Sequence, residues 1–183
     1  MQIKNTYKKI PYYKPNKNLG QQIANSSSQK KIAKHRLVLK KIKNYLFARL
    51  AYNCPVNSWR IKLHRWRGVT IGENVLIGLK VTLDNSFPEY IYIEDDVSLA
   101  GENYILTHSN PYAHFQGRLD SYVAPVIIKK GAWVTIRVTV LPGVTIGENA
   151  IIGAGVVVYR DVPDGAIITL PKHKVVLPEN SNA

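Results

Sequence analysis

The chain has 183 residues, with 25 lysines and arginines against 12 aspartates and glutamates, and its formal net charge is +13. Its single cysteine, Cys54, excludes an intrachain disulfide and a four-cysteine zinc site, and we expect it only to pack. No apolar run approaches the ~20 residues of a membrane-spanning helix, and the N-terminus lacks the apolar core of a signal peptide, so we expect a cytoplasmic protein.

The positive charge is concentrated in the first part of the chain. Residues 1–72 contain 17 basic and no acidic residues, whereas residues 73–183 contain 8 basic and 12 acidic residues. Residues 1–29 are rich in Lys, Asn, Gln and Ser without a clear period, which predicts a basic arm that is flexible or ordered by a partner. Such an arm favours an anionic partner, and we expect it to contact the inner face of the membrane peripherally.

Residues 30–67 predict a helical segment. Apolar residues recur at helical spacing along 30–52 with lysines opposite, and Pro55 ends the pattern. This helix either lies on anionic lipid or packs within its own oligomer and shows its lysines to water. The second basic segment, 58–67, interleaves Trp and Arg but carries no nucleic-acid motif, so we expect no nucleic-acid partner and aromatics that cap the next domain.

Residues 68–165 carry a period of six. Branched aliphatic residues recur at this spacing, and a second small or β-branched residue follows most of them by four positions. An α-helix, with 3.6 residues per turn, would spread this pattern round its surface, whereas short strands that turn every six residues place each aliphatic inside a stacked coil. The twelve aliphatic positions predict about four coils of three strands: Ile71, Ile77, Leu83, Ile93, Leu99, Ile105, Ile128, Val134, Val140, Ile146, Ile152 and Val158.

Two insertions interrupt this period. Four extra residues follow Leu83, near Asp84 and Asn85, and 17 extra residues follow Ile105. The longer insertion carries His108 and His114. Loops that leave a rigid scaffold are common sites of binding and chemistry, so we expect the functional site here. The remaining residues, 166–183, predict a C-terminal tail that covers the last coil or reaches a neighbour.

Three motifs resemble the hexapeptide-repeat acyltransferases, in the branch that holds maltose, galactoside, nodulation-factor and polysaccharide O-acetyltransferases. They are the run from Leu141 through Val158 followed by Arg160-Asp-Val-Pro, the step at Ala132-Trp133-Val134, and the sequence Thr107-His108-Ser109. The resemblance implies an all-β fold, a left-handed parallel β-helix with a protruding loop, here preceded by the helical segment. It also implies a homotrimer with acetyl-CoA, or another acyl-CoA, bound between subunits.

The resemblance also implies site residues. Acetyl transfer to a hydroxyl needs a base for the alcohol proton, and His108 matches the family's catalytic histidine. Thr135 stands where the family usually has Gly, and the family's Gly-Asn-Pro-Ala is replaced by residues 169–172. The residues expected to bind CoA are Thr135, Ile136, Ala154, Arg160, Lys172 and Lys174, and those expected to bind a sugar or glycan acceptor are Asp84, Asn85, Trp133 and His114.

Several functions remain open on the sequence alone. We expect transfer to a sugar hydroxyl of a glycan or glycolipid precursor, but an amino-sugar N-acetyltransferase or an antibiotic acetyltransferase would use the same histidine. A non-catalytic trimeric scaffold or membrane-binding module would also carry the repeat. No metal is expected, because His35, His64 and His173 lie outside the coils and leave no third ligand for His108 and His114.

Overall fold

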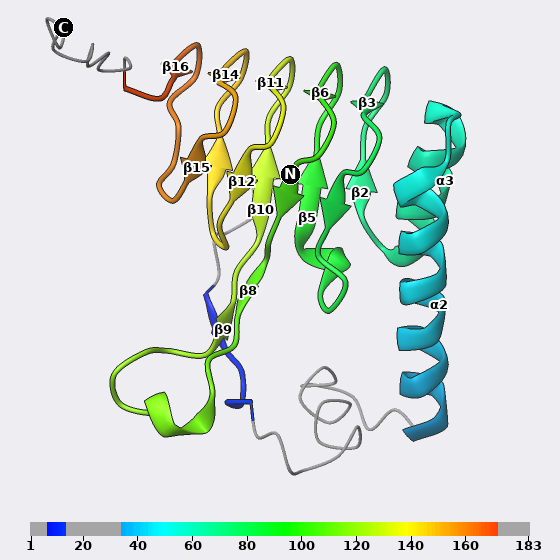
Figure 1. Cartoon of the computed structure of the whole chain (residues 1–183), viewed down its shortest axis with the longest axis vertical. Helices are drawn as coiled ribbons and strands as arrows, with labels where there is room; N and C mark the ends of the chain where they lie inside the picture. Colours follow the sequence, from blue (N-terminus) through cyan, green and yellow to red (C-terminus); the bar gives the residue numbers. More distant parts are fainter. Residues whose placement is uncertain (1–6, 14–33, 172–183) are drawn as a thin grey trace, which may run out of the picture.

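The computed structural model describes residues 7–13 and 34–171, which form a stack of short strands with two helices at one end and a long protruding insertion (Figure 1). The strands follow one another through three parallel sheets in turn. The first sheet has four strands: β2 (Thr70–Ile71), β5 (Ile91–Ile93), β10 (Val126–Ile128) and β13 (Thr145–Ile146).

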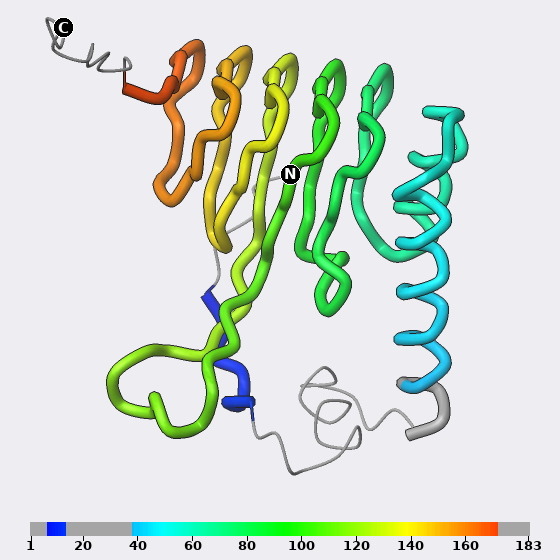
Figure 2. The backbone as a smooth tube through the Cα atoms, viewed as in Figure 1, coloured from blue at the N-terminus to red at the C-terminus, as the bar shows by residue number. Residues whose placement is uncertain are grey.

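The other two sheets complete the prism. The second contains β3 (Leu76–Ile77), β6 (Ser98–Leu99), β11 (Trp133–Val134), β14 (Ile151–Ile152) and β16 (Ile167–Ile168). The third contains β4 (Thr82–Leu83), β7 (Tyr104–Ile105), β12 (Thr139–Val140) and β15 (Val157–Val158). The backbone tube shows the successive turns lying side by side (Figure 2).

The register of the strands explains the period of six. Ile71 pairs with Ile93, Ile93 with Ile128, and Ile128 with Ile146, so equivalent aliphatic side chains stack in a column inside the prism. All twelve aliphatic positions of the period are buried, which confirms that they form the core. Glycine is required where the turns lie close together: a Cβ on Gly78 would lie 2.6 Å from the backbone carbonyl carbon of Ala100 in the next turn.

Two features differ from the predicted boundaries. The stack continues past residue 165, because β16 pairs with β14 in parallel and adds a strand where a tail was expected. Residues 7–13 are not a flexible arm: β1 (Lys8–Lys9) pairs antiparallel with β9 (Tyr122–Val123) of the long insertion. The remainder of the predicted arm, residues 14–29, lies outside the described residues.

The helical segment comprises α2 (Lys34–Asn53) and α3 (Asn57–Arg67). The aromatic residues of α3 do not cap the stack as expected, since Trp59 and Trp66 are exposed. Arginines do so instead, because the first coil leaves strand carbonyls without a neighbouring strand. Within α3, Arg60 donates to the carbonyl of Ile77 at 2.6 Å, Arg65 to that of Ile71 at 3.0 Å, and Arg67 to that of Leu83 at 3.0 Å. Neither described helix is long and apolar enough to cross a bilayer.

Candidate active site

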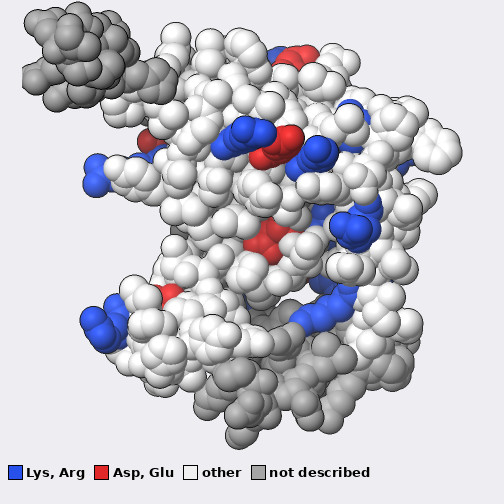
Figure 3. Space-filling model, in the orientation of Figure 1, with Lys and Arg blue, Asp and Glu red and all other residues white. Residues whose placement is uncertain are grey.

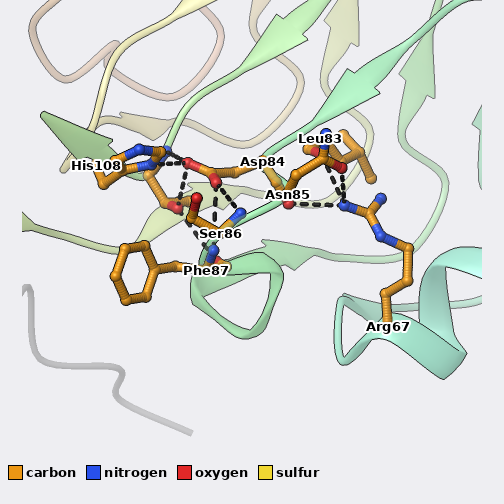
Figure 4. A network of polar contacts seen from close by, with 8 residues as sticks. Arg67, Leu83, Asp84, Asn85, Ser86, Phe87 and His108 are labelled. Atoms are coloured by element: carbon orange, nitrogen blue, oxygen red, sulfur yellow. Dashed lines mark hydrogen bonds and ion pairs between the residues drawn. The ribbon is translucent and has the colours of Figure 1, made fainter. Parts of the chain in front are cut away.

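Both insertions leave the prism at the same corner, in consecutive coils. The short one follows β4 and contains the 3₁₀ helix η1 (Pro88–Tyr90), and the long one follows β7 and contains β8 (His108–Ser109), η2 (Ala113–Phe115) and β9. Because Leu83 pairs with Ile105, Asp84 and His108 come together where the two chains leave the stack. Figure 4 shows His108 facing the Asp84 carboxylate.

Asp84 is a buried carboxylate whose two oxygens are both occupied. One accepts hydrogen bonds from the backbone N–H groups of Ser86 (2.8 Å) and Phe87 (3.2 Å). The other accepts from the N–H and the hydroxyl of Thr107, each at 2.9 Å, and contacts Nδ1 of His108 at 2.5 Å. Burial alone would raise the pKa of Asp84, but the bonds from His108 and the backbone amides together lower it to about 2. The carboxylate is therefore charged at neutral pH.

This charge determines which nitrogen of His108 holds the proton. A carboxylate can only accept, so Nδ1 carries the hydrogen, and in the neutral ring Nε2 keeps its lone pair. The imidazole packs edge-on against the Phe87 ring, with centroids 5.4 Å apart, and its side chain remains 27% exposed. The imidazole is therefore held in a fixed orientation and can be reached by water and ligands. With Nε2 as its basic nitrogen, it is suited to take a proton from an alcohol.

Arg67 supports the corner from behind. Its guanidinium donates to the carbonyl of Asp84 at 2.8 Å and to Oδ1 of Asn85 at 2.7 Å (Figure 4). Its other terminal nitrogen contacts Nδ1 of His64 at 2.9 Å. Burial lowers the pKa of His64 to about 3, and the charges of Arg67 and Arg60 contribute to this shift. His64 is therefore neutral at pH 7, and its Nδ1 accepts the hydrogen bond.

The predicted acceptor residues do not all converge on this corner. Asp84 has a side chain only 1% exposed and no vacant oxygen, so its prediction as a sugar ligand is wrong, and it orients His108 instead. Asn85 is exposed beside it, and its amide NH₂ group has no hydrogen-bond partner among the described residues, so its role stays a prediction. His114 lies beyond the β8–β9 pair, in η2, where its ring packs on Phe115 with centroids 4.1 Å apart. Trp133 is exposed on β11, in a different sheet.

The residues predicted to bind CoA lie at another corner. Thr135 and Ile136 follow β11, and Ala154 follows β14 in the next coil, where the N–H of Gly155 donates to the carbonyl of Ile136 at 3.0 Å. These positions therefore form one edge of the prism, at the opposite end of the third sheet from His108. Arg160 is exposed with its guanidinium over the Tyr159 ring, whereas Lys172 and Lys174 lie outside the described residues. The described residues contain no group of three His, Cys, Asp or Glu side chains that could hold a metal.

Comparison with known proteins places the chain in a family. A model of the bacterial transferase hexapeptide (six repeats) matches residues 125–160. WcaF of Escherichia coli, named as an acetyltransferase of colanic acid biosynthesis, is 30% identical over 125 residues, which cover 60% of this chain and 69% of WcaF. The chain belongs to the hexapeptide-repeat acetyltransferases.

Other relatives agree with this membership. YvoF of Bacillus subtilis, also named as an acetyltransferase, is 29% identical over 131 residues, or 71% of this acetyltransferase and 73% of YvoF. A maltose O-acetyltransferase structure from Clostridium difficile has a TM-score of 0.55 at 25% identity, over 71% of this chain and 81% of that one. VCA0836 of Vibrio cholerae, solved with acetyl coenzyme A, has a TM-score of 0.57 at 20% identity, over 74% of this chain and 84% of VCA0836. These folds imply that the β-helix is left-handed.

Sequence reasoning missed how this acetyltransferase orients its histidine. Both residues were singled out, but Asp84 was expected to bind the acceptor and His108 to act as the base, with no contact predicted between them. The signal that joins them is the spacing: each follows the third strand of a coil, and consecutive coils stack in register. Phe87 and Arg67, which pack on and support this pair, gave no separate signal, because an aromatic in a loop and an arginine in a basic helix are both common.

Proposed function

We propose that this protein is an acetyl-CoA-dependent O-acetyltransferase that acts on a sugar hydroxyl, with His108 as the general base. The observation that carries the proposal is the contact between Nδ1 of His108 and the buried, charged carboxylate of Asp84, since it leaves Nε2 as the basic nitrogen. The names of the relatives support the acetyl donor and the sugar acceptor, since they include a maltose O-acetyltransferase structure and an acetyl-CoA complex.

The reaction would proceed by direct transfer. Nε2 of His108 takes the proton of the acceptor hydroxyl as its oxygen attacks the thioester carbonyl carbon, and the carbon–sulfur bond then breaks. The imidazolium returns the proton to the CoA thiolate, so no acyl-enzyme forms. During this exchange the Asp84 carboxylate stabilises the imidazolium and holds the ring plane.

The proposal includes a homotrimer whose subunits are β-helices of about four coils. The corner with Thr135, Ile136 and Ala154 and the corner with His108 stand at opposite ends of one sheet of the same chain. A neighbouring subunit could bring its own copy of the first corner beside His108, so that CoA lies between two chains. A cytoplasmic location stays a prediction.

Release of the CoA thiol from acetyl-CoA, measured against a panel of sugars, amino-sugars and chloramphenicol, tests the function. We expect turnover with a sugar hydroxyl, a fall of about 10²–10⁴-fold in His108→Ala, and unchanged thermal stabilisation of that variant by CoA, because CoA binding does not need the base. Gln116→Ala, an exposed change in the same insertion, is the matched control and should keep turnover. Full turnover in His108→Ala would refute the mechanism, and no stabilisation of the wild type by CoA would refute the donor.

A further inference from the structure

The outward face of α2 is apolar. Along this helix Leu39, Ile42, Tyr45, Leu46 and Leu50 are between 50% and 62% exposed. The opposite side, which faces the body, buries a polar side chain and a small one: Asn44 and Ala51. A helix on a water-soluble body normally buries its apolar side, so this arrangement is inverted relative to that of an ordinary surface helix.

The apolar surface continues onto α3. Trp59 and Trp66 are 64% and 59% exposed, and Trp66 packs against Phe47 of α2 with ring centroids 5.5 Å apart. A groove runs between the two helices and is lined mainly by apolar atoms of Leu50, Leu63 and these two tryptophans. We name the exposed apolar residues of α2 together with Trp59 and Trp66 the cap face. It lies at the end of the stack where the first coil begins (Figure 1).

The rim of the cap face is basic. Arg49 and Lys62 line the groove, and among the described residues neither has an ion-pair or hydrogen-bond partner. Lys43 lies close by and donates to the carbonyl of Trp66 at 2.9 Å, and no carboxylate of the described part of the chain pairs with it. Neither helix contains an acidic residue. In Figure 3 the helical end shows basic and uncharged side chains, while the acidic side chains lie over the strands and the insertion.

We propose that the cap face binds the surface of an anionic lipid bilayer. Tryptophans and leucines with a rim of Lys and Arg are the composition of surfaces that insert shallowly at the boundary of headgroups and acyl chains. A second copy of this face would oppose basic rim to basic rim, which disfavours it as the partner. The sequence had suggested contact through residues 1–29 and had left open that the helix within residues 30–52 lies on anionic lipid. The cap face is a defined surface of folded chain that includes part of this helix, and it supplies the apolar contact that charge alone lacks.

Tryptophan fluorescence tests the cap face directly in the full-length protein. The chain has three tryptophans, so Trp133→Phe leaves Trp59 and Trp66 as the only ones. With vesicles of brominated phosphatidylglycerol, we expect quenching of this emission, and with brominated phosphatidylcholine much less. Sedimentation with phosphatidylglycerol vesicles but without quenching would overturn the proposal, because it would assign the binding to basic residues elsewhere.

Matched variants complete the test. Ile42→Asp/Leu46→Asp should weaken binding to phosphatidylglycerol vesicles about tenfold or more. Arg49→Gln/Lys62→Gln should weaken it roughly 20–30-fold, because each basic residue near such a surface contributes about fivefold in affinity. Ile167→Asp, on a side chain 64% exposed at the other end of the stack, should leave binding unchanged. Equal binding by all variants would overturn the proposal, as would a higher oligomer in gel filtration that Ile42→Asp/Leu46→Asp abolishes, since the face would then bind another copy. Thiol release with a soluble sugar should be unaffected by the cap variants, so failure of this inference would leave the proposed function intact.

Discussion

Replacing Asp84 with Asn tests whether this carboxylate sets the tautomer of His108. One Asp84 oxygen accepts two backbone N–H bonds, so the amide oxygen of Asn should take that place and the NH₂ group should face Thr107 and His108. The NH₂ group can only donate, so Nδ1 of His108 must accept and the proton must move to Nε2. The ring would keep its place while losing its basic nitrogen at the acceptor side.

The expected loss follows from that exchange. We expect kcat for thiol release to fall about 10²–10⁴-fold, the usual contribution of general-base catalysis, with the KM for acetyl-CoA unchanged. Two donors of Thr107 would also face the NH₂ group, and one unsatisfied buried donor costs about 1–3 kcal/mol, so the variant should unfold at a lower urea concentration. The double variant Asp84→Asn/His108→Ala should be no slower than His108→Ala alone, because Asp84 acts only through the imidazole. A folded Asp84→Asn protein with kcat within threefold of wild type would refute this reasoning.

Three further variants probe the buried histidine of α3, the close stacking of the coils, and the contact between β1 and the long insertion. His64 has a pKa of about 3 in the folded state, against an ordinary value near 6.5 that we expect in the unfolded state. The unfolded state therefore binds a proton that the folded state does not, and stability is lost as the pH falls through 6.5. Between pH 7 and pH 5 the free energy of unfolding should fall by about 2 kcal/mol. His64→Gln should lose this dependence in urea titrations while His114→Gln keeps it, and equal slopes in all three proteins would contradict the assignment. Gly78→Ala should lower the free energy of unfolding by about 1–3 kcal/mol, because the added Cβ meets backbone at 2.6 Å, and an unchanged melting temperature would contradict the close stacking. Ile10→Asp should detach β1, since Ile10 is buried against Phe87; faster amide exchange in β9 and a lower kcat are expected, and unchanged exchange would show that this contact does not hold the insertion.

The prism could be predicted because its signal is repetitive and local. Each aliphatic at the period of six repeats the same environment, so positions such as Ile77 and Val134 support one another, and all are buried. The extra strand β16 was missed because a turn at residues 160–165 interrupts the spacing before the chain rejoins the sheet.

The site was only half predictable, because its decisive contact joins two insertions. His108 follows a recognisable motif, but the partnership with Asp84 depends on where two loops leave the stack, and only the three-dimensional register shows this. Residues 7–13 were also misjudged: β1 gains its partner from the long insertion more than 100 residues away, and no local period marks such a strand. The inverted helix α2 shows the same limit, since apolar spacing predicts a face and not the direction in which it points.

A crystal structure of the protein with CoA and an acetyl acceptor would test the central claim most directly, through the distance from Nε2 of His108 to the acceptor oxygen. The account predicts an acceptor hydroxyl within about 2.6–3.2 Å of Nε2, the CoA sulfur beside it in a groove between two subunits, and Nδ1 still on Asp84. A CoA sulfur bound elsewhere, with the imidazole of His108 facing bulk solvent, would contradict it.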